Sequence, residues 1–461
     1  MDVLGVVCIP WWLLAPTLLL VGYYIYTTWH FNLFKRAGIP GPSPVPLWGT
    51  ALPFLKDGIL VDDMRVVRKY GKIAGGFMGR TPVLYVSDPD MIKKVLVTEF
   101  NVLSNRAFPD FKEPVVKRTL TMLKNEHWKH VRGLLSPAFS VNKLKMMSGE
   151  LNRCAAQLTR NLEQHVQAGS EFEVKEVVGS FTMDVIASTA FGLRSNAQVQ
   201  QDSDLVKYAK KVFENTAVRP ALFLLFFFPH VIYLLRLFGA KFMDKEVVGY
   251  FCAVVKETII KRKESNITQN DLLGLMLESR MDDPICGEWN KDGLTEEEIL
   301  ASSFTFFLGG YDTTASTLTF LIHSLVINPE CQQKVVDEII ENIGEQEEVT
   351  YEALTKLTYL QMCIDECLRL YPPGVRLDRL VERDSILNGI PLVRGMQIII
   401  PAFALHRDPD FWPQPDHFDP NRFLPQNVAK RHPYTYIPFS QGPRNCIGSH
   451  KIEEVHVLHT S

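Results

Sequence analysis

The chain has 461 residues, and its 49 lysines and arginines are balanced by 52 aspartates and glutamates, giving a net charge of −3. This balance argues against a nucleic-acid-binding protein, because such proteins usually carry a basic excess. The eight cysteines are scattered and no two are spaced as C-x-x-C, which fits reduced thiols in the cytosol better than a disulfide framework.

The first 34 residues are expected to form a membrane anchor. No Asp, Glu, Lys or Arg occurs from Val3 to Phe34, and the apolar run is long enough to span roughly 30 Å of hydrocarbon. Aromatic residues at both ends suit membrane interfaces, and Lys35 and Arg36 place the downstream chain in the cytosol by the positive-inside rule. A cleaved signal peptide is the alternative, but the segment lacks a charged n-region and a clean cleavage site.

Residues 35–50 contain IPGPSPVP, a proline-rich stretch that favours stiff, extended backbone, and we interpret it as a hinge. Most of the sequence after it is typical of helices, and no Gly/Ser-rich linker divides it. Short strands are expected at Ile73–Met78, Pro82–Val86 and Gln397–Ile400. The predicted fold class is therefore mainly α with a small β portion.

An apolar segment at residues 221–239 is too interrupted to be a second membrane span. It is interpreted either as a pair of buried core helices or as a substrate-entry region whose apolar surface dips into a bilayer.

The longest helix is predicted to begin after Thr295, which forms a capping box with Glu298, and to end near Asn328, before Pro329. Its middle reads FFLGGYDTTAS, and each of the two glycines costs about 1 kcal/mol in a helix interior. The bare backbone at Gly309 and Gly310 would leave room for a flat cofactor and a small gas molecule. An acid and a hydroxyl follow directly at Asp312 and Thr313, and such a pair can relay protons. The alternative is a helix kink in which Thr313 bonds its own backbone.

Two further pairs of residues are predicted to share helical faces. Trp128 and Arg132 lie four apart, and an arginine can grip a carboxylate while an indole N–H adds another donor. Glu366 and Arg369 lie three apart, and a surface ion pair is the simplest interpretation.

The segment FSQGPRNCIG, from Phe439 to Gly448, carries most of the information. A thiolate that binds iron needs a tight, backbone-rich turn, and glycines at 442 and 448 would allow one because glycine adopts positive φ without strain. Backbone N–H groups of such a turn, together with Arg444, would stabilise a thiolate at Cys446. A buried, inert cysteine in a Gly-Pro loop is the alternative.

Taken in their order along the chain, these motifs resemble the microsomal cytochrome P450 monooxygenases, most of all the family-3 branch that oxidises drugs and steroids. The segment 439–448 matches the family's F-x-x-G-x-R-x-C-x-G at every fixed position. The resemblance implies a catalytic domain over residues 51–448 that binds haem b, with Cys446 as the iron ligand. It further implies a buried Glu366–Arg369–Arg422 brace. The implied cofactor-binding residues are Arg106, Trp128, Arg132, Gly309, Arg379, Phe439 and Arg444, and the implied catalytic residues are Asp312 and Thr313.

The activity implied is insertion of one oxygen atom of dioxygen into small lipophilic substrates such as steroids, xenobiotics and fatty acids. Electrons would come from NADPH through cytochrome P450 reductase, with cytochrome b5 as a second donor and no role for nucleic acid. The basic stretch from Lys117 to Arg132 would dock the acidic donor, although a solvated face is the simpler interpretation. The implied location is the endoplasmic reticulum membrane, with the catalytic domain on its cytosolic face.

The residues after Cys446 do not resemble the long helix that follows the cysteine loop in the family. They read IGSHKIEEVHVLHTS, and residues 449–461 are accordingly expected to be an atypical short tail. A truncated, haem-free and inactive variant is therefore one alternative. A haem-thiolate isomerase like thromboxane synthase is another, against which the Asp312–Thr313 pair argues.

Overall fold

The computed structural model describes residues 11–108, 111, 113–200, 203–218, 243–265, 269–280, 293–344 and 349–449. The predicted apolar segment 221–239 lies outside these ranges, as do residues 1–10 of the predicted anchor and nearly all of the tail.

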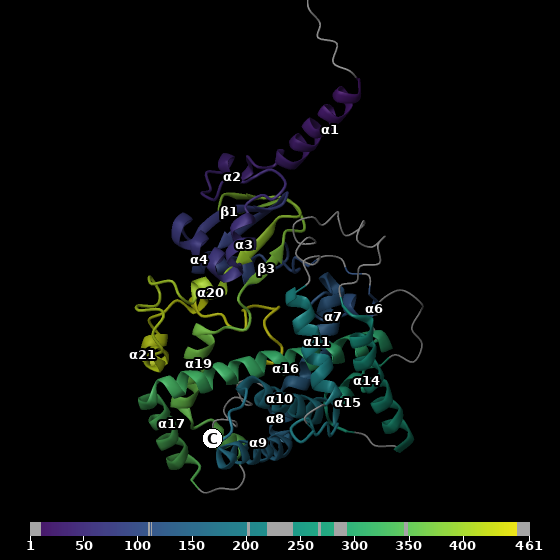
Figure 1. Cartoon of the computed structure of the whole chain (residues 1–461), viewed down its shortest axis with the longest axis vertical. Coiled ribbons are helices and arrows are strands. Elements are labelled where there is room, and N and C mark those ends of the chain that lie inside the picture. The colour runs from purple at the N-terminus through teal and green to yellow at the C-terminus, as the bar shows by residue number, and fades with distance from the viewer. Residues whose placement is uncertain are drawn as a thin grey trace, which may run out of the picture.

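Helices make up most of the described chain (Figure 1). The α-helices are α1 (Trp11–Thr28), α2 (Leu33–Arg36), α3 (Leu52–Asp57), α4 (Ile59–Tyr70), α5 (Pro89–Lys93), α6 (Pro114–Lys117), α7 (Asn125–Leu135), α8 (Val141–Met146), α9 (Ser148–Ala168), α10 (Val174–Phe191), α11 (Asp204–Val218), α14 (Lys245–Ser265), α15 (Leu272–Glu278), α16 (Glu296–Ile327), α17 (Pro329–Asn342), α18 (Tyr351–Leu354), α19 (Thr358–Leu370), α20 (Ala402–Leu405) and α21 (Pro425–Val428). Short turns of other helix types are η1 (Lys94–Thr98), η2 (Ser136–Phe139), η3 (Pro420–Phe423) and η4 (Pro433–Thr435).

The strands form one four-stranded sheet and one hairpin. They are β1 (Ile73–Met78), β2 (Thr81–Val86), β3 (Leu377–Leu380), β4 (Ser385–Leu387), β5 (Ile390–Leu392) and β6 (Gln397–Ile400). The sheet has the order β1-β2-β6-β3, in which only the β2–β6 pair is parallel. The expected strands are confirmed, since β1 and β6 have the predicted bounds and β2 begins one residue earlier. The mainly helical fold with a small sheet portion is confirmed with them.

The long helix α16 organises the domain. It has the predicted capping box, in which the Thr295 side chain accepts from the backbone N–H of Glu298 and the Glu298 side chain accepts from that of Thr295. It crosses the middle of the molecule, with α10 on one side and the segment carrying residues 420–449 on the other (Figure 1). The helix is 32 residues long and most of its side chains are buried, so it forms part of both large core clusters.

Helix α10 packs very closely on the centre of α16. A Cβ atom placed on Gly310 of α16 would lie 2.9 Å from the Ile186 side chain of α10, and one on Gly179 would lie 3.2 Å from the Tyr311 hydroxyl. The buried hydroxyl of Thr182 also donates to the Tyr311 carbonyl oxygen at 3.1 Å. Glycine at 310 is therefore explained by helix packing.

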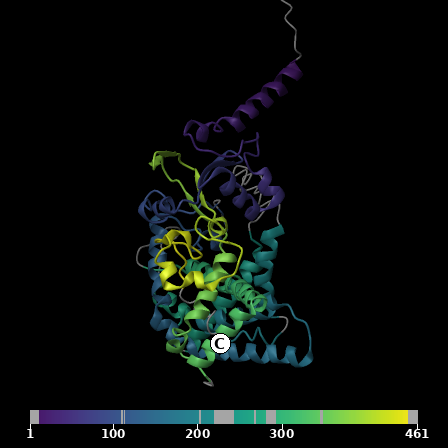
Figure 2. The same cartoon turned by 90° about the vertical axis from the view of Figure 1, so that its left-hand side faces the viewer.

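Helix α1 projects away from the domain beyond the sheet, as both views show (Figures 1 and 2). Its C-terminal end contacts the turn between β1 and β2, where the Arg80 guanidinium lies 3.5 Å from the ring centre of Tyr26. The residues that follow α1 reach the sheet itself, since Phe31 and Phe34 pack on Phe77 of β1. The proline-rich segment also contacts β1, since Pro40 accepts a hydrogen bond from the backbone of Gly75. Among the described helices, none combines the length and the apolar character needed to cross a membrane.

Candidate active site

A cavity of about 410 Å³ lies between α7, α10, α16 and the loop around Cys446. Its wall brings together most of the predicted site residues from segments far apart in the sequence. Those that line it are Arg106, Trp128, Arg132, Gly309, Thr313, Phe439, Arg444 and Cys446. Arg379 and Asp312 are predicted site residues that do not line this cavity.

The cysteine loop closes through its own backbone. The N–H of Cys446 donates to the Phe439 carbonyl oxygen at 2.9 Å, and the N–H of Asn445 donates to that of Gly442 at 3.1 Å. Gly442 has a φ of +77°, and a Cβ atom there would lie 2.3 Å from the carbonyl oxygen of Leu96. Glycine is thus required at 442 for two independent reasons, conformation and space.

The expectation for Gly448 was wrong. Positive φ in this loop occurs at Ser440, with +63°, and at Gly442, whereas Gly448 does not have it. A Cβ atom on Gly448 would make only an ordinary contact of 3.7 Å with Phe139. The turn therefore obtains its second left-handed residue from a serine, which the sequence pattern did not indicate.

Five guanidinium groups gather at or beside the cavity, those of Arg106, Arg132, Arg376, Arg379 and Arg444. Arg379 and Arg444 are almost fully buried, and each has N–H groups without a hydrogen-bond partner. Burial, followed by the positive charge of Arg106, lowers the pKa of Arg379 to about 10. Burial lowers the pKa of Arg444 to about 9, with Arg106 and Arg379 adding to the effect. Within the described chain no aspartate or glutamate lines the cavity, so this cluster has the character of an anion-binding site.

Trp128 and Arg132 project from α7 into the same wall. The Trp128 ring lies under the Arg444 guanidinium, 4.3 Å from its central carbon. Arg132 donates one hydrogen bond to the backbone oxygen and one to the side-chain oxygen of Asn445, both at 3.1 Å. Burial lowers the pKa of Arg132, and the negative charge of a Cys446 thiolate partly opposes this effect. Helix α7 thus places positive charge next to the cysteine loop.

The centre of α16 is open on its cavity side. A Cβ atom on Gly309 would meet nothing within 4 Å, in contrast to Gly310 on the packed side. The Thr313 hydroxyl lines the cavity and donates to the Gly309 carbonyl oxygen at 2.5 Å. The Asp312 carboxylate instead forms an ion pair with Lys175 of α10 at 3.0 Å. The structure therefore brings Thr313 to the cavity but turns Asp312 towards a different helix.

A buried ionic network braces the chain behind the cysteine loop. Arg369 makes two hydrogen bonds, of 2.7 and 2.8 Å, to the Glu366 carboxylate, and both side chains are fully buried. Arg422 lies 3.3 Å from the same carboxylate, and Asp419 donates its backbone N–H to it. The predicted three-residue network is present, and the interpretation of Glu366 and Arg369 as a surface ion pair is wrong.

Sequence reasoning missed several residues at the site. Asn105 is completely buried and accepts hydrogen bonds from Arg444 and from the backbone of Asn125. Asn445 holds Arg132, and Asp63 forms a buried pair with the cavity-lining Arg376. Asn105 and Asn445 directly precede the predicted residues Arg106 and Cys446, and this adjacency in the sequence could have identified them. The Asp63–Arg376 pair joins distant segments, so no sequence pattern indicates it.

The cavity fits a flat group that carries negative charge at one edge and a metal ion at its centre. Gly309 leaves free space along α16, the guanidinium groups offer unpaired N–H donors, and the sulfur of Cys446 is a metal ligand. A mainly helical domain with such a cavity is typical of haem-thiolate proteins, and we assign the chain to this class.

Comparison with known proteins agrees with this class. Residues 39–450 match the family model described as Cytochrome P450. The chain is 37% identical to Cytochrome P450 3A28 of Bos taurus over 444 residues, which cover 95% of this chain and 85% of that one. It is 38% identical to Cytochrome P450 3A14 of Cavia porcellus, with 95% and 86% covered, and 37% identical to Cytochrome P450 3A11 of Mus musculus, with 97% and 88% covered. The chain belongs to the cytochrome P450 family and is a monooxygenase of its family-3 branch, with haem b as cofactor.

Proposed function

We propose that this chain oxidises small lipophilic substrates, such as steroids, xenobiotics and fatty acids, with electrons that a reductase takes from NADPH. The observation that carries the proposal is that one cavity wall contains the iron-ligand candidate Cys446, three arginines and two residues of α16, namely Arg106, Arg132, Arg444, Gly309 and Thr313. Apolar side chains from α10 and α16 complete that wall, among them Ile186 and Phe306, and they suit a substrate with little polarity.

Each predicted cofactor-binding residue has a proposed task. Haem bound here supplies the activation of dioxygen, and Cys446 holds its iron through a thiolate. Arg106, Arg132, Arg379 and Arg444 bind the carboxylates of the haem, with Trp128 as a further donor. Phe439 holds the loop closed through its carbonyl oxygen, and Gly309 provides the space for the flat ring.

Asp312 and Thr313 are proposed to deliver protons during the reaction. The Thr313 hydroxyl keeps its proton on the Gly309 carbonyl oxygen at the edge of the cavity. Asp312 lies one residue away, on the side that leads towards Lys175 and solvent. This arrangement supports a path in which Asp312 takes up protons from outside and Thr313 presents them to the cavity.

The electron donors are proposed to dock on the basic surface around α7. Lys117, Lys124 and Lys129 lie on this side, and charge attraction would steer an acidic partner to it. NADPH-cytochrome P450 reductase is the proposed donor and cytochrome b5 a second one. Two bases of this stretch already have acidic partners, because Arg118 pairs with Glu297 of α16 and Lys129 lies 4.0 Å from Glu126.

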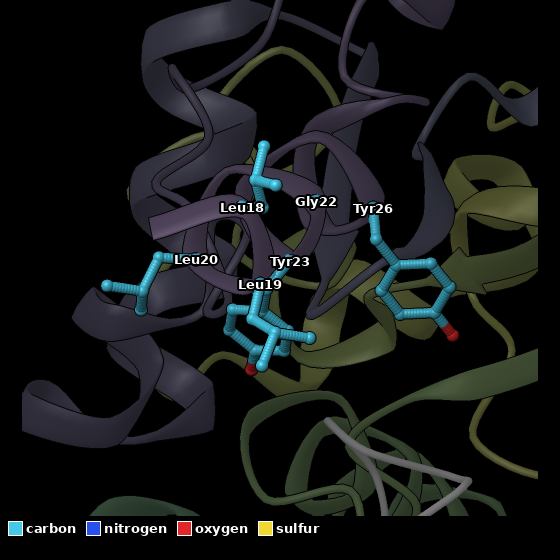
Figure 3. Close-up of a pocket in the computed structure, with 6 residues that line it drawn as sticks. All are labelled: Leu18, Leu19, Leu20, Gly22, Tyr23 and Tyr26. Atoms are coloured by element: carbon cyan, nitrogen blue, oxygen red, sulfur yellow. The ribbon is translucent and has the colours of Figure 1, made fainter. Parts of the chain in front are cut away.

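Residues 1–34 are proposed to anchor the protein in the endoplasmic reticulum membrane, with the domain at residues 51–448 on the cytosolic face and 35–50 as the connecting segment. The support is the apolar surface of α1. Leu18, Leu19 and Leu20 are 62%, 74% and 68% exposed, and they form part of a shallow hollow with Tyr23 and Tyr26. Figure 3 shows these side chains pointing outward in several directions around the helix.

Incorporation of labelled oxygen tests the proposal. Membranes containing the protein are incubated with a steroid under ¹⁸O₂, with and without NADPH and reductase, and the products are analysed by mass spectrometry. One ¹⁸O atom in the product, dependent on both NADPH and reductase, is expected. Product formation from a peroxide substrate without any electron donor would instead identify a haem-thiolate isomerase, and a chain that holds no haem would identify an inactive variant.

A further inference from the structure

The side chain of Asn105 lies at the centre of a buried hydrogen-bond network, one residue before Arg106. Its amide nitrogen donates to the side-chain oxygens of Asn125 and Glu382, both at 2.7 Å. Its amide oxygen accepts from the backbone N–H of Asn125 at 2.9 Å and from the Arg444 guanidinium at 3.3 Å. An asparagine side chain offers two donors and two acceptor lone pairs, so all four are used and the orientation of the amide is fixed.

Through this network Asn105 joins the cysteine loop, the start of α7 and β3. Asn125 is the first residue of α7, three residues before Trp128. The backbone oxygen of Asn105 accepts from the N–H of Leu380 at 2.8 Å, and Leu380 directly follows Arg379 in β3. One buried residue therefore links three segments that carry proposed cofactor-binding residues.

The hydrogen-bond partners of Arg444 are uncharged. Its Nη2 atom donates to the Leu123 backbone oxygen at 2.6 Å and to the Asn105 amide oxygen, while its Nε atom has no partner among the described residues. Arg444 also takes part in none of the ion pairs formed within the described ranges. A neutral acceptor holds a guanidinium in place without cancelling its charge, which remains available to an anionic ligand.

We propose that Asn105 is a positioning residue for haem, which directs Arg444 towards the carboxylates of the haem without neutralising it. The amide oxygen of Asn105 faces the guanidinium and its amide nitrogen faces the Glu382 carboxylate, so the residue separates a buried positive charge from a nearby negative one. An aspartate of the same size would present a carboxylate to Arg444 and compete with the haem for it. This inference rests on the proposed task of Arg444, and it adds a residue that acts through it.

Asn105→Asp tests the part that charge plays. Release of haem is followed by its transfer to an excess of apomyoglobin, and the reduction potential of the bound haem is measured by spectroelectrochemical titration. The variant is expected to release haem about ten times faster, as the loss of a charge-assisted hydrogen bond allows. The reduction potential should shift to a more negative value, because an added carboxylate beside the haem disfavours the uptake of an electron.

Asn105→Ala tests the part that position plays, because it removes the oxygen that holds Arg444 and leaves the charges unchanged. Haem release should be about threefold faster, in keeping with the loss of one weaker hydrogen bond, and the reduction potential should stay that of the wild type.

Asn152→Asp and Asn152→Ala are the matched controls. Asn152 of α9 also joins two segments, since its side chain donates to the Val349 backbone oxygen at 3.0 Å and accepts from the Val349 N–H at 3.1 Å. It does not line the cavity. Both controls should keep the haem release and the reduction potential of the wild type, even where the unfolding temperature of the haem-free protein falls.

Wild-type haem release and potential in Asn105→Asp would overturn the proposal, and so would haem release in Asn105→Ala that is no faster than in Asn152→Ala. If Asn105→Asp does not fold, the two alanine variants decide. Arg444→Met is measured alongside them. Fast haem release in Arg444→Met with wild-type behaviour of both Asn105 variants would remove the role of Asn105 alone, whereas wild-type release in Arg444→Met would contradict the task of Arg444 itself.

Discussion

The backbone N–H of Cys446 donates to the carbonyl oxygen of Phe439 at 2.9 Å. This bond joins the two ends of the segment Phe439–Cys446, so the position of the sulfur is set by a closed backbone turn and not by its side chain alone. The turn is supported in its middle by positive φ at Ser440 and Gly442. Substitutions that restrict the backbone conformation of this turn should therefore displace the Cys446 sulfur and weaken its binding to iron.

Gly442→Ala should damage the cysteine loop, and Gly448→Ala should not. At position 442 an alanine would have to adopt positive φ and would meet Leu96 backbone atoms, which together should cost more than about 2 kcal/mol. At position 448 the added methyl makes only an ordinary contact. Because Gly448 also lines the cavity, the unfolding temperature of the haem-free protein checks this pair, and equal destabilisation in both variants would contradict the account.

Arg379→Met should separate anion binding from structural support. The buried Arg379 has two N–H groups without partners, so removal of its charge should leave the stability of the haem-free protein unchanged or raise it. Haem affinity should fall by roughly 10- to 100-fold, as expected for a charge-assisted hydrogen bond. Haem titration and thermal unfolding of the haem-free protein measure the two effects. A parallel loss of both would mean that Arg379 is only structural.

Arg369→Ala should prevent stable folding. It would leave the buried Glu366 carboxylate without its closest partner, and breaking a buried ion pair typically costs about 3–5 kcal/mol. Lys72→Met breaks an exposed pair with Asp410 and should cost less than about 1 kcal/mol. The yield of soluble, haem-loaded protein and its unfolding temperature compare the two variants, and similar behaviour would argue against the brace.

Acid should destabilise the protein through His406. Burial, with the positive charges of Arg369 and Arg407, lowers the pKa of His406 to about 3. Its Nε2 atom accepts a hydrogen bond from the backbone of Ile437, just before the cysteine loop. Because the folded state keeps this imidazole neutral while the unfolded chain binds a proton below pH 6.5, stability falls as pH decreases from about 6.5 towards 3.

From pH 7.5 to 5.5 this one group should lower the free energy of unfolding by about 1.4 kcal/mol. His406→Gln keeps an acceptor for the Ile437 N–H and should lose that part of the pH dependence. Unfolding measured across this pH range checks the expectation, with His323→Gln, which replaces an exposed histidine of α16, as control. A His406→Gln protein as acid-sensitive as the control would show that another group is responsible.

Features set by nearby residues could be predicted from the sequence. The capping box of Thr295 and Glu298 depends on residues within one helical turn. The cysteine loop was predicted from its specific spacing, whereas the arginines around it were implied by the resemblance to the family. The strands β1 and β6 were found from their composition, although their positions in one sheet were not.

Features that depend on the packing of distant segments could not be predicted. The pairing of Asp312 with Lys175 requires the register of α10 on α16, and the pairing of Arg132 with Asn445 requires the distance from α7 to the cysteine loop. The sequence also does not show that Gly309 opens the cavity while Gly310 fills a helix contact, because the two glycines are adjacent and identical.

The carbon-monoxide difference spectrum of the reduced protein tests the central claim, that Cys446 holds haem iron through a thiolate. The account predicts a strongly red-shifted Soret band for the wild-type protein in membranes and loss of this band in Cys446→Ser. A folded wild-type protein without the band, or a Cys446→Ser protein that retains it, would contradict the assignment.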